Sequence, residues 1–386
     1  MVRYGLTLMF ILLMIFGCAK PDEQKSPDGF VRVEGKHFYI GDSPYYFCGT
    51  NLWYGANLGS PGAGGDRERL VRELDHLKSL GINNLRVLGA SEGEGSSRIR
   101  QSFQPSLGEY NENLLVGLDF LLKEMAHRKM YAVVYLNNYW VWSGGMSQYM
   151  SWIRNEPVPN PFLPEYSWTQ FMNFSATFYE NPEANRYYRD YLRILINREN
   201  TFTGVVYKND PTIMAWQLAN EPRPGRGEMG RQNANAFYRW IDETATFIKS
   251  LDPDHLVTTG NEGTMGSLES PEIYLRAHRS ANVDYMTFHL WVKNWGWFDA
   301  GDIEGTYESA EQKAIAYLKE HFHYADSLGK PLTLEEFGIP RDGESYQPGT
   351  PTTARDRYYE TVFSAIYENA KAGGPMAGSN FWTWGG

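Results

Sequence analysis

Cysteine is scarce in this sequence, with only Cys18 and Cys48 among 386 residues. Disulfide bonds therefore contribute little to the fold, and its stability must come from a buried apolar core. Apolar residues make up 42% of the chain, which is enough for a core of considerable size. Cys48 lies in the run Tyr45-Tyr46-Phe47-Cys48-Gly49, and we expect it to be a small buried side chain.

An excess of positive charge is also lacking, because 46 Asp and Glu outnumber 36 Lys and Arg and give a net charge of −10. An acidic surface repels phosphate backbones, so we expect no nucleic-acid partner. The sequence contains neither His-Glu-x-x-His, nor a zinc-type spacing, nor the phosphate-loop pattern Gly-x-x-x-x-Gly-Lys-Ser/Thr. A neutral polymer is compatible with this charge, and we expect the protein to be a monomer.

The N-terminus has the composition of a targeting segment. The apolar run Leu6–Phe16 follows Arg3, and it is too short to span a bilayer well. Such a run is typical of the core of a signal peptide. We predict residues 1–19 as a signal peptide, residues 20–29 as a linker, and an exported mature protein.

Two interpretations of the end of this segment remain open. Ile15-Phe16-Gly17-Cys18 resembles a bacterial lipobox, in which Cys18 would carry a lipid and tether the protein to the outer face of a membrane. Gly17-Cys18-Ala19 also fits the small-x-small site of an ordinary signal peptidase. The predicted location is therefore the cell surface as a lipoprotein, or the periplasm or exterior as a free protein.

Strand-like and helix-like segments alternate along most of the chain, after a hairpin formed by 30–33 and 37–40. The strand-like runs are Tyr45–Thr50, Asn84–Leu88, Tyr131–Leu136, Ile213–Leu218, Leu256–Thr259, Tyr285–His289, Leu332–Phe337 and Ser379–Thr383. The helix-like runs are 66–80, 111–129, 182–198, 232–250, 311–328 and 354–372, with a weaker one at 267–280. Eight such alternations predict an α/β fold of the (β/α)₈ TIM-barrel type, built from residues 30–386.

Three features refine this prediction. A doubly wound open sheet is the alternative, but no glycine-rich turn follows the first strand. The eighth strand is followed only by Gly385 and Gly386, so we expect the chain to be truncated before a last covering helix. The insert 138–181 is rich in Trp, Tyr, Pro and Asn, and we predict that it forms an active-site loop.

Two glutamates stand at the ends of predicted strands. Glu221 follows Trp216-Gln217-Leu218-Ala219-Asn220, and Glu336 follows Leu332-Thr333-Leu334-Glu335. The active site of a barrel lies at the C-terminal ends of its strands, so both carboxylates should reach one cleft. A pair of carboxylates is the minimal equipment for cleaving a glycosidic bond, with one as acid and the other as nucleophile or base.

Aromatic residues support a carbohydrate substrate. They make up 15% of the chain, including 12 Trp, and many lie beside Gly, Asn and Ser as in surface loops. Aromatic rings can stack on the apolar face of a pyranose, although they also fill cores. The pair of carboxylates needs no metal and no organic cofactor, and we predict none.

The ordered motifs resemble glycoside hydrolase family 5, and in particular its β-mannanase branch. Besides Asn220-Glu221-Pro222 and Glu336-Phe337-Gly338, the matching segments are Gly49-Thr50-Asn51-Leu52-Trp53-Tyr54, Asn83-Asn84-Leu85-Arg86-Val87, Leu136-Asn137-Asn138-Tyr139-Trp140, Thr287-Phe288-His289-Leu290-Trp291 and Phe381-Trp382-Thr383-Trp384. The resemblance covers about residues 30–386 and implies a catalytic barrel that hydrolyses β-1,4-mannosidic bonds, in mannan or another neutral β-glycan, with retention of configuration.

The resemblance assigns Glu221 as the acid/base and Glu336 as the nucleophile. Glu221 must be protonated near neutral pH, which requires a dry and poorly compensated position. Glu336 must stay ionised, and Arg86 at the end of the second strand is the expected counter-charge. Neighbouring residues of a strand face opposite ways, so we expect Glu335 to face the helices or to pair structurally.

The resemblance also implies a set of substrate-binding residues. Asn220 would bond the sugar 2-hydroxyl, His289 would lie close to the carboxylates, and Trp382 would form the sugar platform. Many relatives carry a tyrosine that bonds the nucleophile at the position of Trp291. Further substrate-binding residues are expected from the matching segments and from the fifth strand end, namely Trp53, Asn137 and Glu262.

Several alternatives remain open from the sequence. Trp140, Trp142, Trp295 and Trp297 are candidates for outer subsites or for packing, and Trp384 for a subsite wall or the core. The protein could be a mannan endo-1,4-β-mannosidase, or an exo-acting β-mannosidase whose long 138–181 loop blocks one end of the cleft. A cellulase on the same fold is another alternative. A catalytically silent glycan-binding surface protein is disfavoured, because a binding module has no need of paired carboxylates.

Overall fold

The computed structural model describes residues 29–94 and 99–385 of the chain. The predicted signal peptide, Cys18 and all but the last residue of the predicted linker lie outside the described residues. In the part that the structure describes, no helix is long and apolar enough to cross a membrane.

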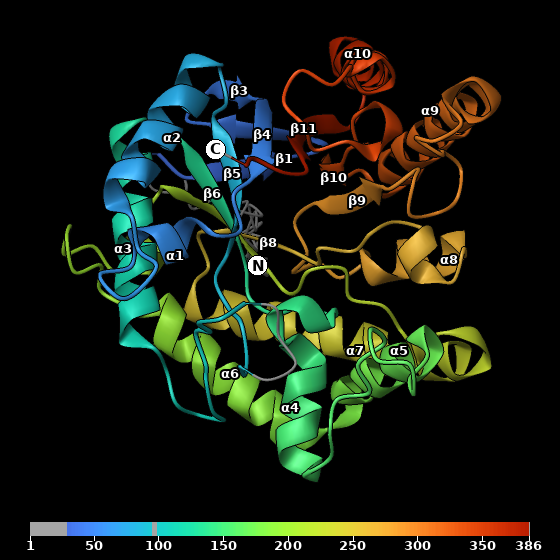
Figure 1. Cartoon of the computed structure of the whole chain (residues 1–386). Coiled ribbons are helices and arrows are strands. Elements are labelled where there is room, and N and C mark those ends of the chain that lie inside the picture. Colours follow the sequence, from blue (N-terminus) through green and yellow to red (C-terminus); the bar gives the residue numbers. More distant parts are fainter. Residues whose placement is uncertain (1–28, 95–98, 386) are drawn as a thin grey trace, which may run out of the picture.

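Eight parallel strands form a nearly closed barrel, and helices surround it (Figure 1). The barrel strands are β4 (Phe47–Asn51), β5 (Asn84–Leu88), β6 (Tyr131–Tyr135), β7 (Ile213–Gln217), β8 (Leu256–Thr258), β9 (Met286–Leu290), β10 (Leu332–Phe337) and β11 (Met376–Phe381). Their order is β8-β7-β6-β5-β4-β11-β10-β9. A parallel bridge between Thr258 and Tyr285 links β8 and the start of β9, the two ends of this order. The predicted (β/α)₈ TIM barrel is therefore confirmed.

The outer helices follow the apolar periodicity of the sequence. They are α2 (Arg67–Ser79), α3 (Glu112–His127), α6 (Pro182–Ile196), α7 (Gly227–Leu251), α8 (Pro271–Ala277), α9 (Ile303–Leu328) and α10 (Thr353–Lys371). The Asp66 side chain caps α2 by accepting a hydrogen bond from Arg69 N at 2.9 Å, and Gly329 ends α9 in the left-handed conformation. The helix α9 begins eight residues before the predicted start, where Asp302 caps it.

A small antiparallel sheet covers the N-terminal end of the barrel. It consists of β1 (Val31–Glu34), β2 (His37–Ile40) and β3 (Ser43–Tyr45), so the predicted hairpin gains a third strand. Phe38 of β2 packs edge-on against Tyr285 with ring centres 5.2 Å apart. Tyr45 was predicted to begin the first barrel strand, but it pairs with Phe38 in β3 instead.

The prediction that Cys48 is buried is wrong. Successive side chains of a strand point to opposite sides, and Phe47 and Gly49 are buried in β4. Cys48 therefore faces outward and is exposed.

The insert 138–181 was predicted to be a loop, and this prediction is wrong because most of the insert is helical. It contains α4 (Gly145–Arg154), α5 (Trp168–Ala176) and the 3₁₀ turns Val141–Ser143 and Thr177–Glu180. Ser167 and Gln170 form a capping box at the start of α5. The two helices pack against each other, α4 also contacts α6 and α5 contacts α7, and the buried side chains include Met146, Tyr149 and Phe171. Shorter elements complete the fold, namely α1 (Gly55–Gly59) and the 3₁₀ turns Tyr207–Asn209, Met265–Ser267 and Asp342–Glu344.

Candidate active site

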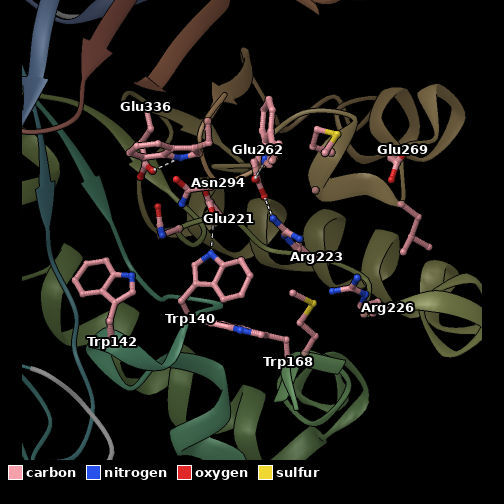
Figure 2. A pocket seen from close by; sticks show the side chains of 18 of the residues that line it. Trp140, Trp142, Trp168, Glu221, Arg223, Arg226, Glu262, Glu269, Asn294 and Glu336 are labelled. Atoms are coloured by element: carbon pink, nitrogen blue, oxygen red, sulfur yellow. Dashed lines mark hydrogen bonds and ion pairs between the residues drawn. The ribbon is translucent and has the colours of Figure 1, made fainter. Parts of the chain in front are cut away.

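A cavity of about 820 Å³ opens at the C-terminal ends of the barrel strands (Figure 2). Both predicted catalytic glutamates line it, and both side chains are nearly fully buried. Its wall comes from the insert after β6 and from the loops after β7, β8 and β9. The lining residues are Trp140, Trp142, Phe162, Trp168, Met172, Asn220, Glu221, Arg223, Gly225, Arg226, Glu262, Met265, Gly266, Leu268, Glu269, Trp291, Asn294, Trp295, Glu336 and Trp382.

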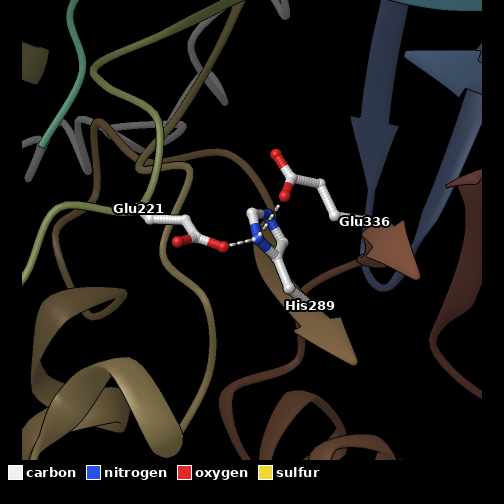
Figure 3. A group of neighbouring side chains, drawn as sticks. All are labelled: Glu221, His289 and Glu336. Atoms are coloured by element: carbon white, nitrogen blue, oxygen red, sulfur yellow. Dashed lines mark hydrogen bonds and ion pairs between the residues drawn. The ribbon is translucent and has the colours of Figure 1, made fainter. Parts of the chain in front are cut away.

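Glu221 and Glu336 face each other across His289 (Figure 3). One oxygen of each carboxylate and one ring nitrogen of His289 all lie within 4.8 Å of one another. Retaining glycosidases keep their carboxyl groups about 5–5.5 Å apart, whereas inverting enzymes need about 6.5–9.5 Å to admit a water. The observed separation therefore fits direct attack by one carboxylate on the sugar.

The backbone around Glu221 is held in an uncommon conformation. Its φ angle is 49°, a left-handed value that costs about 1–3 kcal/mol for a residue with a side chain. Two hydrogen bonds fix this conformation, one from Asn220 N to Asn137 O at 2.8 Å and one from Glu221 N to Gly260 O at 2.9 Å. Asn137 thus helps to aim the Glu221 carboxylate through its main chain.

Arg86 lies at the centre of the barrel and is fully buried. Its guanidinium donates to Glu336 Oε1 at 2.5 Å and to Asn220 Oδ1 at 2.6 Å. It also donates to Gln217 Oε1 at 2.8 Å and to Asn51 Oδ1 at 3.0 Å. The predicted counter-charge of Glu336 is therefore in place, and the same group fixes Asn220.

Glu335 also turns toward Arg86, so the expected strict alternation of Glu335 and Glu336 does not hold. The pairing of β10 with β9 shifts between Leu334 and Glu336, which is the register change of a β-bulge. Glu335 Oε2 consequently lies 3.7 Å from Arg86 Nε and accepts a hydrogen bond from Gln217 Nε2. Glu335 thus pairs structurally, as expected, but it does so inside the barrel.

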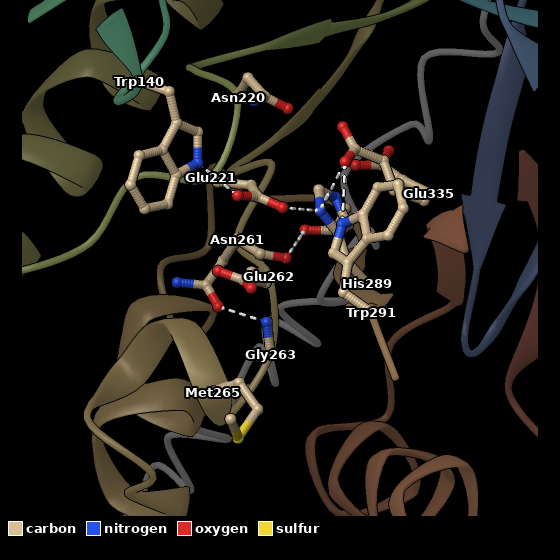
Figure 4. A network of polar contacts seen from close by, with 12 residues as sticks. Trp140, Asn220, Glu221, Asn261, Glu262, Gly263, Met265, His289, Trp291 and Glu335 are labelled. Carbon is tan, nitrogen blue, oxygen red and sulfur yellow. Dashed lines mark hydrogen bonds and ion pairs between the residues drawn. The ribbon is translucent and has the colours of Figure 1, made fainter. Parts of the chain in front are cut away.

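His289 and two tryptophans complete the surroundings of the carboxylates (Figure 4). His289 Nδ1 lies 2.5 Å from Glu221 Oε1 and 3.4 Å from Glu336 Oε2. Trp140 Nε1 donates to Glu221 Oε2. Trp291 Nε1 donates to Glu336 Oε2 at 3.2 Å, so an indole N–H contacts the nucleophile at the position where the family resemblance implies a tyrosine.

The protonation of the centre follows from burial and from these contacts. Burial raises the pKa of both Glu221 and Glu336, because each carboxylate has lost its water. Arg86 contacts Glu336 directly and favours its ionised form, so we assign the proton of the pair to Glu221. Burial also lowers the pKa of His289 to about 4, so the imidazole is neutral at physiological pH.

An aromatic wall bounds the cavity beside Glu336. Trp382 packs edge-on against Trp291 and Trp142, with ring centres 6.1 and 6.3 Å apart. Trp53 then packs against Trp142 at 5.9 Å and is not among the residues that line the cavity. Trp382 is thus in the place predicted for a sugar platform, while Trp53 supports the wall from behind.

The other end of the cavity carries an ion pair. Arg223 binds Glu262, and its guanidinium carbon lies 4.8 Å from the ring centre of Trp140. Trp295 Nε1 donates to the same Glu262 at 3.3 Å. Glu262 was predicted as a substrate-binding residue, and the structure places its carboxylate in this end of the cavity.

The remaining predicted aromatic residues fall into two groups, those that line the cavity and those that lie outside it. Trp140, Trp142 and Trp295 line the cavity, whereas Trp297 packs behind Trp295 with ring centres 5.0 Å apart. Trp384 lies outside the cavity, against His76 at 5.2 Å.

Sequence reasoning missed several residues of the site. Asn51 and Gln217 anchor Arg86, and Arg223, Trp168 and Phe162 line the cavity. Arg223 follows Glu221-Pro222 directly and could have been found from that position. Trp168 and Phe162 could not, because nothing local in the insert indicates which of its aromatic residues face the cavity.

Comparison with known proteins places this geometry among carbohydrate-active enzymes. Residues 28–386 match the sequence model of a family described as "GH family 5 beta-mannosidase-like". Mannan endo-1,4-beta-mannosidase 5 of Solanum lycopersicum is 31% identical over 393 residues, which cover 97% of this chain and 86% of the relative.

Two solved structures show the same architecture. The glycoside hydrolase family 5 mannosidase of Rhizomucor miehei has a TM-score of 0.86 and 38% identity, over 93% of this chain and 86% of that one. A variant of that enzyme was solved in complex with mannosyl-fructose. The endo-1,4-beta-D-mannanase of Thermotoga petrophila has a TM-score of 0.68 and 26% identity, over 88% of each chain.

Glu335→Gln should stabilise the protein at high pH more than at low pH. Burial raises the pKa of Glu335 from 4.5 to about 7, so the folded chain keeps a proton there that the unfolded chain releases. Stability from this group is fully present below about pH 4.5 and is lost as the pH rises through about 7. The increase in the free energy of unfolding caused by Glu335→Gln should therefore be about 2–3 kcal/mol larger at pH 8 than at pH 5.

Urea denaturation at both pH values measures this difference. The amide oxygen introduced at position 335 can still accept the hydrogen bond from Gln217. The control is Glu360→Gln on the exposed face of α10, which should change the free energy of unfolding by the same amount at both pH values. An equal effect of the two substitutions would contradict the assignment.

Proposed function

The chain belongs to glycoside hydrolase family 5, and on that premise we propose that Glu336 and Glu221 carry out its reaction as nucleophile and acid/base. The protein hydrolyses β-1,4-mannosidic bonds in mannan-type polysaccharides or oligosaccharides with retention of configuration. The observation that supports the two roles best is the position of Arg86, which contacts Glu336 at 2.5 Å and leaves Glu221 without a direct cationic partner.

The first step forms a covalent glycosyl-enzyme. A carboxylate oxygen of Glu336 attacks the anomeric carbon, and Glu221 gives its proton to the departing oxygen. Asn220, fixed by Arg86 at 2.6 Å, is placed to bond the sugar 2-hydroxyl. This hydrogen bond strengthens as positive charge develops at the anomeric carbon, so it lowers the barrier rather than only binding the substrate.

The second step releases the sugar. Glu221, now ionised, takes a proton from a water molecule, and the water attacks the anomeric carbon from the side that the leaving group vacated. The bond to Glu336 then breaks. Two inversions at the same carbon give net retention, and no redox or metal chemistry is required for the balance of atoms.

Glu336→Ala should abolish activity on every substrate, because no glycosyl-enzyme can form. Glu221→Ala should lower kcat on mannan oligosaccharides by about 10²–10⁴-fold, the usual contribution of a general acid. A dinitrophenyl mannoside scarcely needs the acid, so Glu221→Ala should still form the glycosyl-enzyme from it. Azide should then restore turnover and yield the β-mannosyl azide, detected by mass spectrometry and NMR.

The same experiment can also contradict the assignment of the two roles. Rescue of Glu336→Ala by azide with a β-product, or no trapped intermediate in Glu221→Ala, would show that the roles are exchanged or that the mechanism is different.

Endo action is the activity in the names of the plant relatives and is the first candidate for this chain. Exo action is the second, and the one-sided cavity favours it. The cavity extends from Glu336 past Glu221 to Arg223, on the side of the leaving group. Beside Glu336 the cavity is lined by Trp142 and Trp382, whose ring centres are 6.3 Å apart, and we propose that these two rings close it at this end.

Product analysis on mannohexaose with a reduced end separates the two modes. Exo action should release single mannose units first, whereas endo action should release di- and trisaccharides. If Trp142 closes the cavity, Trp142→Ala should shift the first products toward longer fragments. The control Trp297→Ala, behind the cavity, should leave the product pattern unchanged. Release of di- and trisaccharides by the unsubstituted protein would contradict exo action.

The N-terminal segment supports export as a separate proposal. The apolar run after Arg3 and the position of Cys18 fit a lipoprotein signal peptide. Mass spectrometry of the mature N-terminus from a bacterial host should find lipidated Cys18 as the first residue. An unmodified N-terminus at any other residue would contradict the lipid anchor.

A further inference from the structure

The catalytic centre holds more buried carboxyl groups than buried guanidinium groups. Four carboxylates, those of Glu221, Glu262, Glu335 and Glu336, are at most 6% exposed, and they share one connected network of contacts. Two guanidinium groups oppose them, Arg86 and Arg223. If all four carboxylates were ionised, the network would carry a net charge of −2, and a dication that displaces the proton assigned to Glu221 would compensate this excess.

Three of the side chains offer donor atoms to a common point. Glu221, His289 and Glu336 come from the ends of three different strands, and one donor atom of each lies within 4.8 Å of those of the other two (Figure 3). His289 is fully buried, and its Nδ1 faces both carboxylates. Two carboxylates and an imidazole are a donor set that suits zinc and its first-row neighbours.

The distances allow such an ion with small shifts of the side chains. A tetrahedral Zn²⁺ with bonds of about 2.0–2.1 Å sets its ligand atoms about 3.4 Å apart. His289 Nδ1 and Glu336 Oε2 are 3.4 Å apart. The Glu221 carboxylate, 2.5 Å from His289 Nδ1, would need to withdraw by about 1 Å, and the cavity gives it room to do so.

We propose that the pair of catalytic glutamates and His289 also form a binding site for a divalent transition-metal ion, which inhibits the enzyme by occupying the nucleophile and the acid together. The fourth position of the ion faces the cavity and would hold water. Mg²⁺ and Ca²⁺ should bind poorly, because they prefer six or more oxygen ligands. The inference does not depend on which glycosidic bond the enzyme cleaves.

The test measures binding of the metal itself. Full-length protein freed of metal by a chelator should bind one equivalent of Zn²⁺ by titration calorimetry, and Co²⁺ at the same site should give visible absorption bands. Zn²⁺ should also raise the Tm, because it binds only the folded chain. Glu221→Gln, His289→Asn and Glu336→Gln should each weaken binding at least tenfold and remove the shift in Tm.

A matched control is available on the surface. His127 Nδ1 lies 3.9 Å from Glu124 Oε2 in α3, and His127→Asn should leave the affinity for Zn²⁺ unchanged. Inhibition of the unsubstituted enzyme should be competitive with substrate and reversed by EDTA. Unchanged binding in the three variants, a loss of binding in His127→Asn, or equal inhibition by Mg²⁺ would overturn the proposal. Loss of catalysis in a variant that still binds Zn²⁺ would count against the metal site and leave the proposed reaction intact.

Discussion

The buried guanidinium group of Arg86 is the interaction on which the active site depends. It joins the ends of three other strands, since Asn51 of β4, Gln217 and Asn220 at the end of β7, and Glu336 of β10 all accept its hydrogen bonds. Burying a carboxylate without a partner would neutralise it, so Glu336 could not serve as a nucleophile in this dry position without Arg86. The planar fork of donors also fixes direction, which a lysine could not do.

The barrel and its inserts contribute different properties to the site. The strands position the centre, because Arg86, His289 and Glu336 lie within β5, β9 and β10, and Glu221 follows the end of β7 by four residues. The shape of the cavity comes from the connections, above all from the helical insert 138–181 with Trp140, Trp142 and Trp168. A rigid sheet thus sets the distances between reacting atoms, while the inserts decide which sugar chains can approach.

Much of the fold and of the catalytic centre could be predicted from local sequence patterns. Eight apolar runs with helical segments between them are enough to indicate the barrel, and the breakers after Glu221 and Glu336 place both residues at strand ends. Arg86 was correctly expected beside Glu336. These predictions succeed because each depends on the period of a strand or helix and on where it ends.

The predictions that failed depend on contacts between distant segments. Glu335 turns inward because the pairing of β10 with β9 slips by one residue, and no feature of β10 alone indicates this slip. Helices α4 and α5 are stabilised by burying Met146, Tyr149 and Phe171 against each other and against α6 and α7, so composition alone suggested a loop. Cys48 is exposed because Phe47 and Gly49 take the inward positions of β4.

The indole of Trp291 has a consequence for the movement of protons. A tyrosine hydroxyl can donate, accept or pass on a proton, whereas an indole N–H can only donate. Trp291 contacts Glu336 at 3.2 Å, and Arg86, which also contacts it, is likewise only a donor. Among the described neighbours of the nucleophile, the proton from an incoming water can therefore pass only to Glu221 or to the neutral His289. The side chain of Trp291 therefore binds the nucleophile without offering the incoming water a base.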